Sequence, residues 1–114
     1  MLAVIFEVEP HSEYQSEYLE IAAQLKPLLE TIDGFISVER FESLSHPGKI
    51  LSLSYWRDEE AISEWRNLEK HRQAQTQGRE RVFADYRLRV ASIQREYAMH
   101  SRDQAPGDSR SVHG

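Results

Sequence analysis

The fold is decided by the stretch from Tyr55 to Tyr86, whose sequence is YWRDEEAISEWRNLEKHRQAQTQGRERVFADY. Its aromatic start predicts the end of a strand. Asp58 and the two glutamates after it predict the start of a short helix, because acidic side chains stabilise the free N–H groups of a first helical turn. We expect a second helical segment over residues 69–83 and a last strand over residues 85–97. Helices between two strands are typical of an α+β domain.

The N-terminal part predicts one strand and one long helix. Residues 2–9 form an apolar run with β-branched residues, and Pro10 ends it because proline cannot donate to a sheet ladder. Ser12 and Gln15 have the spacing of a capping box at a helix start. One buried helical face is predicted by apolar residues at Tyr14, Tyr18, Ile21, Ala22, Leu25, Leu28, Leu29 and Ile32.

A hairpin is expected next, with strands over residues 35–44 and 49–57 around a turn-forming Ser-His-Pro-Gly segment. Both faces of these strands carry large apolar groups. The expected faces are Phe35 with Phe41 against Ile36 with Val38, and Leu51, Leu53 and Tyr55 against Ile50, Ser52, Ser54 and Trp56. A sheet with one wet face alternates apolar and polar residues, so this pattern indicates that both faces are covered.

The order of these elements is that of a ferredoxin-like split β-α-β-β-α-β fold with an antiparallel sheet. The chain has too few helices to cover both faces of such a sheet. We therefore expect a homodimer that packs through the open sheet face. Arg87 and Arg89 would point to that face, where we expect carboxylate partners from Glu39, Glu42 or a facing subunit.

Composition excludes several classes of function. The 114 residues suffice for one domain, and a net charge of -5 gives no general attraction for nucleic acid. The absence of cysteine removes disulfides and thiolate sites and fits a cytoplasmic protein. The apolar N-terminus meets Glu7 and Glu9 too early for a membrane span. Residues 98–114 are polar and rich in Ser, Arg and Asp, so we expect a disordered tail.

Residues 1–97 resemble the antibiotic biosynthesis monooxygenase family. The resemblance is carried by an aromatic strand end at Trp56, a helix with Trp65, His71 further along and the Gly78-Arg79 pair. It implies a ferredoxin-like fold dimerised into an α+β barrel. It also implies a cofactor-independent monooxygenase that acts on an electron-rich aromatic substrate such as a quinol or an anthrone.

The catalytic residues that follow from this resemblance are His71 and Arg79. The imidazole would serve as the base, since its pKa is close to neutrality, and the guanidinium would hold the substrate anion. A histidine on a half-buried helix face is equally well explained by a structural hydrogen bond. His71 therefore has two open interpretations at this point.

The substrate-binding residues expected beside them are Trp65 and Phe83 as stacking walls, with Gln75 and Asn67 as hydrogen-bond donors or acceptors. Trp65 also fits plain core packing, because it is at helical spacing from Ala61 and Ile62. Trp56 is expected to close the hairpin rather than to cap a pocket. Polar helix residues such as Asn67 usually face water.

Bound metals and redox cofactors are not expected. The histidines outside the helices, His11, His46, His100 and His113, have no ligand spacing, and no glycine-rich phosphate loop is present. Two other functions stay open. One is a dimeric module that binds a small ligand without turnover. The other is haem binding and degradation, although Gln75 stands where that branch of the superfamily has its axial histidine.

Overall fold

The computed structural model describes residues 1–75 and 82–113, with side chains described up to residue 68 and from residue 82 to residue 112. The elements are β1 (Leu2–Pro10), a 3-10 turn η1 (Ser12–Tyr14), α1 (Gln15–Leu29), β2 (Phe35–Glu42), β3 (Ile50–Trp56), α2 (Glu59–Gln75), β4 (Phe83–Ser92) and α3 (Gly107–His113). The strands form one antiparallel sheet in the order β2-β3-β1-β4. This topology confirms the ferredoxin-like split β-α-β-β-α-β fold.

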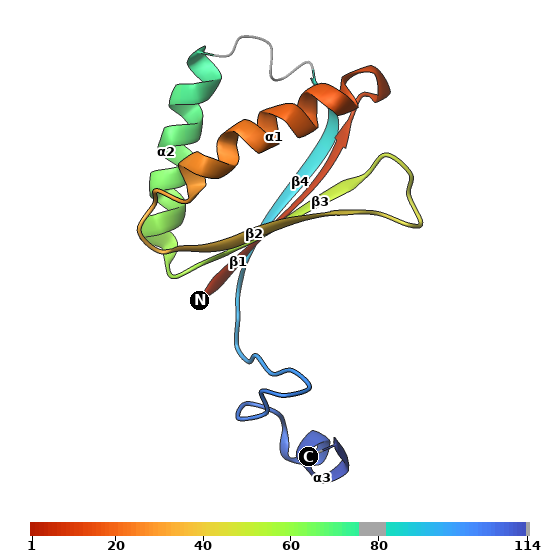
Figure 1. Ribbon diagram of the computed structural model, residues 1–114, viewed down its shortest axis with the longest axis vertical. Helices are drawn as coiled ribbons and strands as arrows, with labels where there is room; N and C mark the ends of the chain where they lie inside the picture. Colours follow the sequence, from red (N-terminus) through yellow and green to blue (C-terminus); the bar gives the residue numbers. More distant parts are fainter. Residues whose placement is uncertain (76–81, 114) are drawn as a thin grey trace.

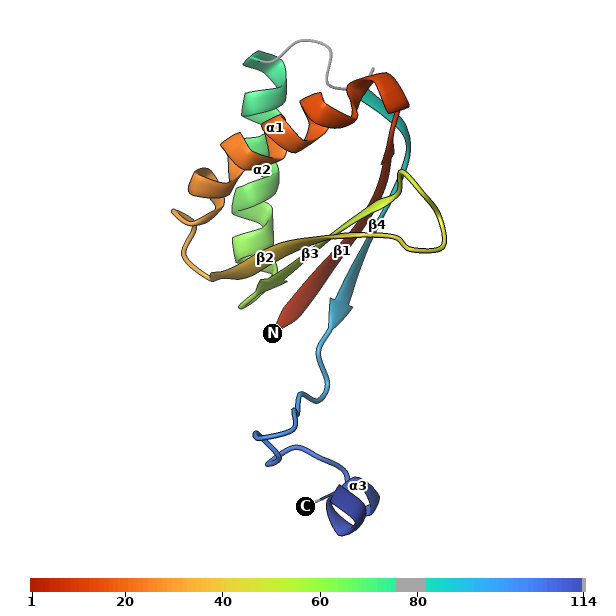
Figure 2. The same ribbon diagram turned by 45° about the vertical axis from the view of Figure 1, so that its right-hand side comes forward.

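Helices α1 and α2 lie on the same side of the sheet, and its other face is open in both views (Figures 1 and 2). The buried side chains between the helices and the sheet form two neighbouring clusters. The first cluster contains Leu29, Ile32, Trp56, Ala61 and Ile62. The second contains Val8, Tyr18, Ile50 and Val82. Members of both clusters line the cavity that forms the candidate site.

The start of α1 differs from the expected capping box. Residues Ser12–Tyr14 form a 3-10 turn, in which the N–H of Tyr14 donates to the carbonyl of His11 at 2.8 Å. Helix α1 begins only at Gln15, and no side-chain hydrogen bond caps it. The prediction of a Ser12 cap was wrong, because the tighter first turn already satisfies the backbone there. The buried face of α1 is as expected, with Tyr18, Ala22 and Leu29 inward.

The faces of β2 were predicted incorrectly. Phe35 and Val38 both pack against the helix-side core, although strict alternation puts them on opposite faces. The register of β2 against β3 shifts between Phe35 and Ser37, so one extra residue is accommodated there. A bulge of this kind reverses the alternation for the rest of the strand. Arg40 therefore joins Val38 on the face toward the helices, with consequences for the site.

A single helix, α2, replaces the two helical segments predicted after β3. Asp58 caps it as expected, since its carboxylate accepts the N–H of Ala61 at 3.0 Å. This hydrogen bond, followed by one from Arg57, holds the pKa of Asp58 below its ordinary value of 3.8. The helix runs to Gln75, and the last strand begins at Phe83 instead of residue 85.

The open face of the sheet carries a mixture of apolar and charged groups. Ile5, Leu51, Leu53 and Tyr55 lie on it, and each is partly exposed. Arg89 donates from Nη1 to the Glu7 carboxylate on the neighbouring strand at 3.3 Å, and Lys49 lies 3.2 Å from the other oxygen of Glu7. The partner of Arg89 is thus Glu7 rather than Glu39 or Glu42. Hydrogen bonding to Lys49 lowers the pKa of Glu7.

The C-terminal segment leaves the sheet after β4 and extends away from the helices (Figures 1 and 2). It contains the short helix α3, and Arg110 donates to the backbone carbonyl of Arg102 at 3.0 Å. The disorder expected for residues 98–114 in solution stays a prediction. None of the helices in the described residues is long and apolar enough to cross a membrane.

Candidate functional site

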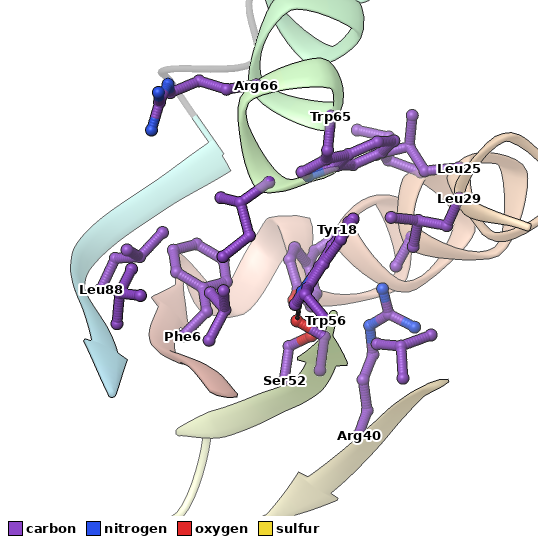
Figure 3. Close-up of a pocket in the computed structure, with 17 residues that line it drawn as sticks. Phe6, Tyr18, Leu25, Leu29, Arg40, Ser52, Trp56, Trp65, Arg66 and Leu88 are labelled. Carbon is purple, nitrogen blue, oxygen red and sulfur yellow. Dashed lines mark hydrogen bonds between the residues drawn. The ribbon is translucent and has the colours of Figure 1, made fainter. Parts of the chain in front are cut away.

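A cavity of about 180 Å³ lies between α1, α2 and the helix-side face of the sheet. Most of its wall is apolar. All four strands and the helices α1 and α2 contribute residues to it (Figure 3). The lining residues from the helices are Tyr18, Ile21, Ala22, Leu25, Leu29, Ile62, Trp65 and Arg66. Those from the sheet are Val4, Phe6, Val38, Arg40, Ser52, Ser54, Trp56, Leu88 and Val90.

Two tryptophans form the aromatic wall of the cavity. Trp56 is only 1% exposed, and its indole Nε1 donates to the hydroxyl of Ser54 at 2.9 Å. The ring of Phe35 meets it edge-on, with centroids 5.2 Å apart. Trp65 on α2 is half-buried and packs against the same cluster. Trp56 is therefore both a core residue and a wall of the cavity, whereas the sequence favoured hairpin closure.

The polar groups among the described lining residues are the hydroxyls of Tyr18, Ser52 and Ser54, the indole N–H groups of the two tryptophans and two arginines. Arg40 extends from β2 toward Trp56 and Leu29, and its Nε atom is shielded from solvent without a hydrogen-bond partner (Figure 3). Arg66 lies on α2 and is exposed at the rim. Among the described residues, no aspartate or glutamate lines the cavity. The site thus has a positive charge within an apolar wall, in a chain whose net charge is -5.

The size of the cavity limits what it can hold. An engineered apolar cavity of about 150 Å³ binds benzene, so about 180 Å³ suits a molecule with one ring. The wall is incomplete near β4, where Leu88 and Val90 are 53% and 44% exposed. A substituent on the ring can extend through this opening.

Comparison with known proteins identifies the family. Residues 1–77 match the family model described as "Antibiotic biosynthesis monooxygenase". The chain belongs to this family. A curated relative, "Jasmonate monooxygenase ABM" from Pyricularia oryzae, is 50% identical over 93 residues, which are 82% of this chain and 43% of that protein. The chain thus spans less than half the length of this relative.

Solved structures of the same architecture include proteins with different chemistry. A mutant of SnoaB, described as a cofactor-independent oxygenase from Streptomyces nogalater, superimposes with a TM-score of 0.67 at 10% identity, covering 83% of this chain and 94% of SnoaB. The haem degrader MhuD from Mycobacterium tuberculosis gives 0.67 at 14% identity, covering 86% of this chain and 100% of MhuD. At these identities, the likeness establishes the fold and leaves the substrate open.

The residues predicted from the family resemblance lie in different parts of this antibiotic biosynthesis monooxygenase domain. Trp65 lines the cavity. Phe83 is the first residue of β4 and packs edge-on against Phe6 and Tyr18, which do line the cavity. Asn67 is exposed on α2 and is not part of the cavity wall. The aromatic residues are therefore in or next to the cavity, and Asn67 faces away from it.

The predicted catalytic residues His71 and Arg79, and the predicted substrate-binding residue Gln75, lie in the segment whose side chains the structure does not describe. His71 and Gln75 belong to the last turns of α2, where the structure describes the backbone alone. Arg79 lies outside the described residues. Their roles stay predictions. Among the described residues, no group of three His, Asp or Glu side chains is arranged to hold a metal ion.

Arg40, Ser52 and Ser54 line the cavity, although no sequence motif marks them as site residues. Ser52 and Ser54 had been assigned correctly to the face of β3 that carries Trp56, which was the available signal. Arg40 lies opposite Ser52 in the register of β2 against β3. Alternation already puts Arg40 on the same face of β2 as Val38, but whether that face meets the helices depends on the bulge between Phe35 and Ser37.

Proposed function

We propose that the chain is a monooxygenase that oxidises a small ring compound in the cavity between α1, α2 and the sheet. The observation that carries this proposal is the apolar cavity with two tryptophan walls, in a member of the antibiotic biosynthesis monooxygenase family. Binding in such a cavity removes the substrate from water and brings it close to the protein groups around it. The volume favours one ring and argues against a three-ring anthrone inside the wall.

Two substrates have support. The first is an electron-rich quinol, which after deprotonation can reduce O2 itself and needs only a base and a group that stabilises its anion. His71 would be that base, with Arg79 or Gln75 near the anion, and the reaction would need no bound redox cofactor. The second is jasmonate, because the relative with 50% identity carries that activity in its name. Insertion of one oxygen atom into jasmonate also needs two electrons to reduce the other oxygen atom to water, so a two-electron reductant such as a reduced nicotinamide nucleotide must be added to the assay with this substrate.

We further propose that two copies pack through the open face of the sheet. Ile5, Leu51, Leu53 and Tyr55 form a partly exposed apolar strip there, with the helices on the opposite face. Burial of such a strip stabilises a dimer by about 25 cal/mol for each Å² of apolar surface removed from water. The cavity lies on the helix side, so both copies would keep their cavities accessible.

The decisive experiment measures O2 uptake by the purified chain with jasmonate and with a one-ring quinol, after subtraction of autoxidation. Ala22 and Ala23 are adjacent on α1, but only Ala22 is buried and lines the cavity. Ala22→Leu should therefore reduce uptake at least tenfold, whereas Ala23→Leu should not. Circular dichroism of both variants controls for the fold. Equal activity in both variants would place the reaction outside this cavity.

His71→Ala tests the proposed base. We expect O2 uptake with the quinol to fall about 100-fold, within the range typical of general-base catalysis. The circular dichroism spectrum and the melting temperature should remain close to those of the unmodified chain. Activity equal to that of the unmodified chain would remove His71 from the mechanism.

The two other functions predict different results. A binding module without turnover would show a ligand-dependent rise in melting temperature and no O2 uptake. A haem protein would show a shifted Soret band on titration with haem. Its cavity would also have to open, since about 180 Å³ is suited to a single ring.

A further inference from the structure

The guanidinium of Arg40 is placed unusually for a group that only supports the fold. Its Nε lies inside the protein without a partner, on a cavity wall made mainly of Val38, Leu29 and Trp56. Among the described residues, no carboxylate forms an ion pair with Arg40 and no carbonyl accepts a hydrogen bond from it. A shielded, charged donor without a partner destabilises the folded state.

The neighbouring acidic residues do not relieve this cost. Glu39 is on the opposite face of β2, where it pairs in register with Leu53, and Glu42 is exposed near the hairpin. The only polar lining groups near Arg40 in the sheet are the hydroxyls of Ser52 and Ser54. The oxygen of Ser54 already accepts from Trp56, and a hydroxyl does not neutralise a guanidinium. The described residues therefore leave a positive charge for a ligand to compensate.

We propose that the cavity binds its substrate as a carboxylate, with Arg40 as the anchoring residue. This inference rests on the proposed function in taking the cavity as the substrate site. A guanidinium presents parallel N–H groups that match the two oxygens of a carboxylate, which a single-oxygen phenolate cannot use together. Ser52, opposite Arg40 in the sheet register, offers a further donor. The ring of the substrate then lies against Trp56 and Trp65.

Arg66 gives the same site a second, weaker preference for anions. It lies at the rim on α2, and its guanidinium extends toward the β4 side in Figure 3. No acidic side chain lines the described part of the cavity, so the two arginines act in the same direction. Because Arg66 is exposed, its contribution should decrease with salt, whereas that of the shielded Arg40 should decrease less.

Benzoate and benzamide form a matched pair of probes, because both are planar single rings of similar size and only benzoate is charged. We expect the unmodified chain to bind benzoate at least 10-fold more tightly than benzamide in a calorimetric or NMR titration. Arg40→Met should abolish this preference and leave benzamide binding within about twofold. Arg40→Lys should retain part of it, since a lysine keeps the charge and loses the fork geometry. Arg66→Met should weaken benzoate binding a few-fold, and mainly at low salt.

A stability measurement separates a ligand site from a structural role. If Arg40 serves a ligand, Arg40→Met removes an Nε donor that is shielded without a partner and should raise the melting temperature of the ligand-free chain. If Arg40 supports the fold, the same substitution should lower it. Arg66→Met, at an exposed position, is the control and should change the melting temperature little.

Equal affinity for benzoate and benzamide, no saturable benzoate binding, or a preference that persists in Arg40→Met would overturn the carboxylate site. These outcomes are distinct from failure of the proposed function. O2 uptake with a neutral quinol, together with equal affinity of the unmodified chain for benzoate and benzamide, would support the monooxygenase and remove the carboxylate anchor. Selective benzoate binding with no O2 uptake on any substrate would support the anchor and remove the monooxygenase.

Discussion

Gly34 approaches Ala61 so closely that a Cβ atom on the glycine would lie 2.9 Å from the Cβ of Ala61. This contact joins the turn after α1 to the first turn of α2. Gly34 also has a φ of 94°, which side chains rarely adopt. Next to Gly34, the guanidinium of Arg57 forms an ion pair with Asp33 at 3.2 Å. The loop between α1 and β2 and the loop between β3 and α2 are therefore packed against each other.

Gly34→Ala should destabilise the fold by about 3 kcal/mol, because the new methyl group meets Ala61 and the backbone is left-handed. Gly48→Ala is the matched control. Gly48 has a φ of 89°, but no atom lies within 4 Å of its would-be Cβ, so about 1 kcal/mol is expected. Urea denaturation of the two variants measures the difference. Equal destabilisation would mean that the contact with Ala61 relaxes freely.

Ser54→Ala tests the buried hydrogen bond behind the cavity wall. The substitution leaves the indole N–H of Trp56 without its acceptor at a site that is 1% exposed. We expect a loss of about 1 to 3 kcal/mol, the cost of a buried unsatisfied donor. Ser52→Ala removes a hydroxyl from the same strand face without breaking a hydrogen bond to any described residue, so its cost should be smaller. A reversed order in chemical denaturation would contradict this assignment.

The periodicity of apolar residues was sufficient to predict the strands and helices of the fold. Residues 2–9 read as a central strand, and the apolar rhythm through Tyr18 and Leu29 gave the buried face of α1. Both depend on burial patterns that are local in the chain. The faces of β2 could not be obtained in this way, because a one-residue bulge reverses the alternation without a clear sequence signal.

The candidate site was predicted only in part for the same reason. Trp65 could be assigned because it is on the inner face of a regular helix. Arg40 depends on the bulge at the start of β2 and on the distance to α1, which are set by tertiary packing. Its unpaired Nε is a property of the packed structure, and no spacing in the sequence encodes it.

Acid should weaken the fold through Asp58. The N–H of Ala61, followed by Arg57, lowers the pKa of this carboxyl from 3.8. Its stabilising effect is therefore complete above pH 3.8 and is lost as the pH falls through the lower folded-state pKa. Asp58→Asn keeps a capping oxygen but cannot ionise. We expect this variant to be less stable than the unmodified chain at neutral pH, with the difference shrinking as the pH falls below 3.8.

Urea midpoints measured across this pH range check the prediction for Asp58. Asp103→Asn provides the control, since the Asp103 side chain has no hydrogen bond or ion pair among the described residues. Its effect should not vary with pH in the same way. A constant gap between Asp58→Asn and the unmodified chain down to low pH would show that ionisation of Asp58 does not stabilise the fold.

The proposed dimer gives the last prediction. Leu53 is central on the open face, where it faces Ile5 on one neighbouring strand and Glu39 on the other. Leu53→Lys should preserve the monomer fold, because the new amine lies beside Glu39, and should disrupt packing between sheets by placing a charge in the interface. Leu44→Lys, in a hairpin loop and 101% exposed, is the control.

Sedimentation of the unmodified chain and of the Leu44→Lys control should show dimers at micromolar concentration, whereas Leu53→Lys should sediment as a monomer. The melting temperature should rise with protein concentration only for the chains that dimerise. A stable monomer of the unmodified chain would remove the sheet-to-sheet dimer, but it would leave the helix-side cavity and its arginine intact.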